Sequence, residues 1–239
     1  MRLPACLVAS ATATCLAATQ AIAGCTSDAM VVFDGSGSMA ENGVTMRGGP
    51  RISDARAAIQ QAMPQVAPLR DIGLIVYGPG ARPPCENIRL HFAPRPAAAG
   101  PIILAIDALA PFGTTPLTQA VETAAEVLDF RAAPGVVVLV TDGKETCGGD
   151  PCASALRLRA EAADLTIHVV GFRVRAEYFD WESGAGAGHL EAPTVAECMA
   201  EITGGTYTST ETVGELIAAL NATLGCPLIG RLERSRTAG

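Results

Sequence analysis

Two aspartates and a pair of serine hydroxyls stand at the ends of apolar runs in this sequence. The run AMVVFD ends in Asp34 and is followed by Gly-Ser-Gly-Ser, so that Ser36 and Ser38 alternate with glycines. A second run, VVVLVTD, ends in Asp142. Because ligands of an open parallel sheet bind at the carboxyl ends of its strands, these side chains are expected to lie close together. Carboxylate and hydroxyl oxygens are hard ligands, so the pattern predicts a site for Mg²⁺.

Glycines and a further threonine complete the pattern. Gly35 and Gly37 are expected to let the chain bend sharply, and in such a turn alternate residues can point toward one spot. A third segment, GTTPL, precedes a predicted helix and offers the hydroxyl of Thr115, with Thr114 as the alternative ligand. Three segments that lie far apart in the sequence would therefore contribute oxygen atoms to one site.

Apolar runs alternate with stretches of helical periodicity along most of the chain. Runs rich in β-branched residues predict strands, and apolar residues three or four positions apart predict helices. Strands are expected at 29–34, 72–77, 88–92, 136–142, 165–172 and 206–210, and helices at 52–66, 101–109, 116–130, 152–163, 193–203 and 212–224. Pro64 is expected to kink or shorten the first helix. The alternation predicts an α/β fold with an open, mostly parallel sheet flanked by helices, in one domain from about 26 to 227 with a loosely ordered tail at 228–239.

The site residues and their settings resemble those of the von Willebrand factor A domain and its metal-ion-dependent adhesion site. That site is built on Asp-x-Ser-x-Ser, a threonine in a later loop and an aspartate at a strand end. The matching positions here, in the same order, are Asp34, Ser36, Ser38, Thr115 and Asp142. The resemblance covers nearly the whole chain after the first 23 residues, and it implies a Rossmann-like fold.

The resemblance also implies a function. Domains of this family bind one divalent cation, typically Mg²⁺, and the sequence does not choose between Mg²⁺, Mn²⁺ and Ca²⁺. Ser36 and Ser38 would contact the ion directly, Thr115 would do so when a partner is bound, and the aspartates would often act through water. A carboxylate from a partner protein would complete the coordination. Such an ion lets a net-acidic protein bind an acidic group, because the ion is the largest local charge.

Residues 1–23 have the features of a secretory signal peptide. Arg2 supplies a positive start, an alanine-rich apolar stretch follows, and Ala21-Ile22-Ala23 fits the cleavage rule. No later apolar run reaches the length of about 18 residues that a membrane span needs, so a periplasmic or secreted protein is expected. The alternative is a lipoprotein anchored through Cys25, because Ile22-Ala23-Gly24-Cys25 resembles a lipobox. A ratio of sixteen arginines to one lysine indicates a bacterial source.

The cysteines also point to an oxidising compartment. Cys6 and Cys15 lie in the signal peptide, and the six others, an even number, predict three disulfides. The expected pairs are Cys147 with Cys152 from their short spacing and then, by elimination, Cys198 with Cys226 and Cys25 with Cys85.

Charge and motifs narrow the classes of function. The net charge of −7 and the pI near 5.0 argue against a nucleic-acid partner, which needs a basic surface. The sequence lacks GxxxxGK[ST] and places no GxSxG elbow at the site serines. The phosphatase motif that needs an aspartate two positions after Asp34 has Ser36 there instead. We therefore expect a non-catalytic binding or adhesion module. The alternatives are an envelope-assembly protein whose metal only stabilises the loops, and a metal-dependent hydrolase.

Overall fold

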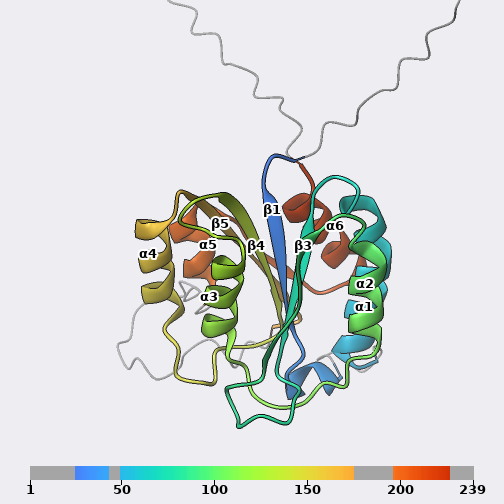
Figure 1. Cartoon of the computed structure of the whole chain (residues 1–239). Helices are drawn as coiled ribbons and strands as arrows, with labels where there is room; N and C mark the ends of the chain where they lie inside the picture. The colour runs from blue at the N-terminus through green and yellow to red at the C-terminus, as the bar shows by residue number, and fades with distance from the viewer. Residues whose placement is uncertain (1–24, 43–48, 175–195, 227–239) are drawn as a thin grey trace, which may run out of the picture.

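The computed structural model describes residues 25–42, 49–174 and 196–226 (Figure 1). The expected signal peptide at 1–23 and the expected tail at 228–239 lie outside the described residues. Within the described residues, no helix is long and apolar enough to cross a membrane.

The centre of the molecule is one six-stranded sheet with the order β3-β2-β1-β4-β5-β6. The strands are β1 (Asp28–Asp34), β2 (Ile72–Tyr77), β3 (Ile88–Arg95), β4 (Pro134–Thr141), β5 (Asp164–Phe172) and β6 (Tyr207–Thr210). β3 runs antiparallel to β2, and all the other pairings are parallel. The central strands are buried on both faces, as their continuous apolar runs predict. This confirms the predicted α/β fold.

Helices cover both faces of the sheet (Figure 1). They are α1 (Arg51–Val66), α2 (Ala99–Asp107), α3 (Leu117–Val127), α4 (Pro151–Glu161), α5 (Glu197–Thr203) and α6 (Val213–Leu224), with a short 3₁₀ turn, η1, at Gly37–Ala40. α1, α2 and α6 pack on one face and α3, α4 and α5 on the other, and each set closes a separate hydrophobic core over the sheet. The sheet thus holds the loops at the carboxyl ends of β1 and β4 on a rigid base.

The sequence predicts that Pro64 kinks or shortens the first helix, but α1 is not shortened there. It continues to Val66, and the N–H of Ala67 still donates to the carbonyl of Met63 at 3.0 Å. A proline in the last turn removes one helical hydrogen bond only, and the buried Met63 and Val66 hold that turn against the sheet.

The part of the chain that the structure describes contains three disulfides, the predicted number, but all three predicted pairs are wrong. The bonds join Cys25 with Cys226, Cys85 with Cys147, and Cys152 with Cys198. The side chain of Asp150 caps α4 by accepting from the N–H of Ala153 at 2.9 Å, so a helix begins between Cys147 and Cys152. As a result Cys152 bonds to α5, whereas Cys147 bonds to the β2–β3 loop.

The disulfide of Cys25 also bears on the lipoprotein alternative. Its sulfur is bonded to Cys226, 201 positions along the chain. A sulfur held in this disulfide cannot at the same time carry the lipid of a lipoprotein anchor.

Candidate metal centre

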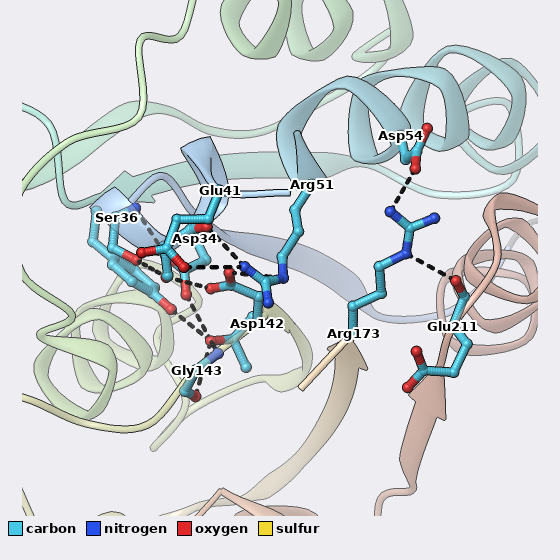
Figure 2. Close-up of polar contacts among 12 residues, drawn as sticks. Asp34, Ser36, Glu41, Arg51, Asp54, Asp142, Gly143, Arg173 and Glu211 are labelled. Atoms are coloured by element: carbon cyan, nitrogen blue, oxygen red, sulfur yellow. Dashed lines mark hydrogen bonds and ion pairs between the residues drawn. The ribbon is translucent and has the colours of Figure 1, made fainter. Parts of the chain in front are cut away.

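Strand register brings the predicted site residues to one end of the sheet. Asp34 pairs with Tyr77 of β2, and Phe33 pairs with Val140 of β4. The carboxyl ends of β1, β2 and β4 therefore lie level with one another, and Asp142 follows directly after β4. The predicted convergence of the two aspartates is observed (Figure 2).

The turn after β1 is organised by Asp34. Its Oδ1 accepts a hydrogen bond from the N–H of Ser36 at 2.8 Å. The hydroxyl oxygens of Ser36 and Ser38 lie 3.0 Å apart, so alternate residues do face one spot. The hydroxyl of Ser38 in turn donates to Oδ1 of Asp142 at 2.7 Å. Four of the five predicted ligands are thus joined by direct hydrogen bonds.

The two glycines of this turn differ in their importance. A Cβ on Gly35 would lie 2.9 Å from the carbonyl oxygen of Tyr77, closer than real contacts allow. A Cβ on Gly37 would meet nothing closer than the carbonyl oxygen of Gly113, at 3.6 Å. Glycine is therefore required at Gly35, because β2 approaches closely there and not because of the bend itself. The expectation that the turn also needs a glycine at Gly37 is wrong.

Thr115 lies in the adjoining loop. The N–H of Gly37 donates to the carbonyl of Gly113 at 3.1 Å, which fastens this loop to the turn after β1. Thr115 is buried, and no hydrogen bond among the described residues joins its hydroxyl to the other four ligands. The hydroxyl of Thr114 accepts from the N–H of Cys85 at 2.9 Å, so Thr115 is the better candidate of the two threonines.

Asp142 is deeply buried and only partly hydrogen-bonded. It is 1% exposed, and its Oδ2 accepts no hydrogen bond in the part of the chain that the structure describes. Burial, together with the nearby carboxylate of Asp34, raises the pKa of Asp142 to about 7. The hydrogen bond from Ser38 and the charge of Arg51 act in the opposite direction. Two carboxylates are therefore held close together with incomplete compensation of their charge.

Three residues outside the five predicted ligands also contribute to the site. Thr141 donates to Oδ2 of Asp34 at 2.7 Å, and the hydroxyl of Tyr77 lies 3.2 Å from the Thr141 oxygen. Burial and then the charge of Asp34 raise the pKa of Tyr77 well above its ordinary value, so it remains a proton donor. Arg51, at the start of α1, points its guanidinium at Asp142 (Figure 2). The position of Thr141 at the end of an apolar run is consistent with this role, whereas the sequence predicts Tyr77 only as a strand residue and no local motif marks Arg51.

The donor set fits a hard divalent cation. It combines two buried carboxylates with serine hydroxyls, and one carboxylate oxygen is without a hydrogen-bond donor. Among the described residues no group of three or more His, Cys, Asp or Glu side chains gathers as a metal cluster. Oxygen ligands with few direct carboxylates are those that suit Mg²⁺ and similar ions.

Comparison with known proteins places the chain in a family. The sequence model of the von Willebrand factor type A domain matches residues 29–145, a segment that contains all five predicted ligands. The chain therefore carries a von Willebrand factor type A domain, and the predicted resemblance is confirmed. Among curated relatives, the uncharacterized protein YwmD of Bacillus subtilis is 32% identical over 153 residues, which are 59% of this chain and 66% of YwmD. The match thus spans about two thirds of that relative.

Solved structures show the same fold at low sequence identity. An aerotolerance-related membrane protein of Bacteroides fragilis is 16% identical with a TM-score of 0.59, covering 83% of this chain and 98% of that one. Proximal thread matrix protein 1 of the mussel byssus, solved with a zinc-occupied MIDAS motif, is 16% identical with a TM-score of 0.53, covering 84% of this chain and 48% of that one. The manganese-loaded TRAP protein of Plasmodium vivax is 15% identical with a TM-score of 0.52, covering 83% of this chain and 73% of that one.

Proposed function

We propose that this protein is an exported, non-catalytic binding module that holds one divalent cation and, through it, an acidic group of a protein partner. Asp34, Ser36, Ser38 and Asp142 would hold the ion, and Thr115 would join them when a partner is bound. One observation carries the proposal. The hydroxyl of Ser38 lies 2.7 Å from Asp142 while the other oxygen of that buried carboxylate has no hydrogen-bond donor.

An ion at this position would supply positive charge and an open coordination position for a carboxylate. The charge that the ion would bring supports the proposal, because Asp34 and Asp142 are both buried, and burial together with the charge of Asp34 raises the pKa of Asp142. The hydroxyls of Ser36 and Ser38 would replace part of the water shell. The mussel and Plasmodium proteins, whose structures hold zinc and manganese, support metal binding by this fold. We propose Mg²⁺ as the ion, with Mn²⁺ or Ca²⁺ as alternatives for the same oxygen ligands.

The disulfides support export. Disulfides persist in oxidising compartments, and three are present among the described residues. Together with the signal-peptide pattern at 1–23, they lead us to propose the periplasm or the extracellular medium as the location.

The test is a binding measurement followed by a pull-down. Isothermal titration should show Mg²⁺ binding by the wild-type protein and at least about a tenfold loss in a Ser36→Ala/Ser38→Ala double variant. Ser209→Ala, on the exposed part of β6, serves as the control and should bind Mg²⁺ normally. Equal Mg²⁺ affinity in the double variant and the wild type would refute the proposed site.

The pull-down tests the role of the ion. Envelope proteins captured by the wild-type protein in Mg²⁺ should be released by EDTA. Capture of the same partners with and without EDTA would instead support a metal that only stabilises the loops. Metal-dependent turnover of generic phosphate or ester substrates would overturn the non-catalytic assignment.

A further inference from the structure

A buried arginine lies beside the candidate metal centre, and no carboxylate accepts a hydrogen bond from it among the described residues. Arg51 opens α1, and its side chain is only 1% exposed. Its backbone N–H donates to the carbonyl of Glu41 at 3.0 Å, which closes the loop between the turn after β1 and α1. The guanidinium lies beside Asp142 (Figure 2) and contacts the backbone of the turn after β1 at Ser38.

The contacts of this guanidinium are few and long for a buried group. Nη1 donates to the carbonyl of Ser38 at 3.0 Å and lies 3.7 Å from a carboxylate oxygen of Glu41, which is half exposed. Nε lies 3.5 Å from Oδ2 of Asp142 without forming a hydrogen bond, and neither Nε nor Nη2 has a hydrogen-bond partner among the described residues. Arg51 thus acts on Asp142 through its charge, and Oδ2 of Asp142 receives no hydrogen bond from it.

A second arginine, which pairs with the first turn of α1, shows the contrast. Arg173, just after β5, is paired with Asp54 at 2.7 Å and donates from Nε to the carbonyl of Glu211 at 2.9 Å. Figure 2 shows this pair separate from the cluster around Asp142. The positive charge of Arg173 is therefore compensated locally, whereas that of Arg51 is directed at the metal centre.

The buried charges decide what the centre can bind. Without an ion, the two aspartates outnumber Arg51 by one negative charge. With a divalent cation, the same buried group carries one net positive charge, and the exposed Glu41 offsets little of it because water screens that carboxylate. Net charge in a buried site is costly unless it is paired. A single anionic group supplied from outside would neutralise it.

We infer that Arg51 is the residue that makes the ion-loaded centre selective for an anionic ligand. It weakens the binding of the ion alone and strengthens the binding of a carboxylate to the loaded centre. This inference rests on the proposed function, and it adds that the selectivity resides in a residue that need not contact either the ion or the partner.

The test measures ion affinity and its dependence on a carboxylate, with acetate as the probe. Mg²⁺ and Mn²⁺ are titrated by calorimetry at about pH 8, once in chloride and once in acetate at equal ionic strength. Arg51→Met removes the charge and keeps the volume, Arg51→Lys keeps the charge, and Arg173→Met is the matched control.

For Arg51→Met we expect a higher Mg²⁺ affinity in chloride but a smaller gain in affinity from acetate. Arg51→Met should bind Mg²⁺ roughly tenfold more tightly in chloride, and the increase in apparent affinity that acetate gives the wild type should vanish. Arg51→Lys and Arg173→Met should behave as the wild type does. A purely structural role for Arg51 would instead lower the melting temperature of Arg51→Met and leave or weaken its Mg²⁺ affinity, which would overturn the inference.

A second variant covers the case in which Arg51→Met does not fold. Glu41→Gln alters a half-exposed side chain and makes the centre more positive, so it should bind Mg²⁺ about twofold more weakly and show a larger effect of acetate. Tighter Mg²⁺ binding by Glu41→Gln together with a smaller effect of acetate would refute the inference. If the wild-type protein bound neither ion, the proposed function itself would fall, whereas normal ion binding without these charge effects would refute the role of Arg51 alone.

Discussion

The hydroxyl of Ser38 donates a 2.7 Å hydrogen bond to Oδ1 of Asp142, although the two residues are 104 positions apart in the sequence. This bond joins the turn after β1 to the end of β4. It holds the oxygen atoms of both segments at hydrogen-bonding distance from each other, as the proposed metal centre requires.

Ser38→Ala should destabilise the protein in EDTA by about 1–3 kcal/mol, because it removes the hydrogen-bond donor from a buried carboxylate oxygen. Urea unfolding in EDTA measures this change. Ser209→Ala, at an exposed position of β6, should shift the unfolding free energy by no more than about 0.5 kcal/mol. Equal stability of the two variants would show that the bond to Asp142 contributes nothing.

Gly35→Ala and Gly37→Ala form a matched pair within the same turn. The new methyl group at Gly35 would lie 2.9 Å from the carbonyl oxygen of Tyr77, and we expect a loss of about 1–3 kcal/mol from this overpacking. At Gly37 the nearest atom is 3.6 Å away, so a change below about 0.5 kcal/mol is expected. Thermal unfolding of both variants decides the matter, and a more severe effect at Gly37 would contradict the packing described here.

The disulfide between Cys85 and Cys147 ties the β2–β3 loop to the loop that follows Asp142. Replacing both cysteines by serine should lower Mg²⁺ affinity, because the loop behind Asp142 gains freedom that binding must then remove. The matched control replaces Cys152 and Cys198, which join α4 to α5. That change should reduce stability by about 2–4 kcal/mol and leave Mg²⁺ affinity unaltered. Peptide mapping without reduction checks the pairs themselves.

His168 should make the folded protein less stable in mild acid. Burial and then the positive charge of Arg70 lower the pKa of His168 below its ordinary 6.5, and Nδ1 accepts from the N–H of Thr206 at 3.1 Å. Below pH 6.5 the unfolded chain therefore takes up this proton more readily than the folded one, so stability falls as the pH drops toward the folded pKa.

The measurement is denaturant unfolding from about pH 7 to about pH 5. His168→Asn keeps an acceptor near the position of Nδ1 and cannot be protonated there, so it should lose less stability over this range than the wild type. A difference between the two proteins that stays constant with pH would show that His168 does not titrate as described.

Local pattern was enough to predict the elements and the site positions. The apolar runs that end in Asp34 and Asp142 became β1 and β4 because β-branched and apolar residues without polar interruption suit strands buried on both faces. Parallel strands present their carboxyl ends at one edge, so the order of elements already implied that the two aspartates would meet. This inference needed no knowledge of any distance.

Tertiary structure alone decided the partners of individual side chains. Cys147 pairs with Cys85 rather than with its neighbour Cys152, and Arg51 faces Asp142. Where a helix starts and how a loop closes decide the direction in which each of these side chains points, and the spacing of residues in the sequence does not give that direction. The requirement for glycine at Gly35 likewise depends on the approach of another strand. The sequence by itself determined the fold class and the five candidate ligands. The packed structure decided the cysteine pairs and the charge around those ligands, since both depend on which distant segments come within a few ångströms of each other.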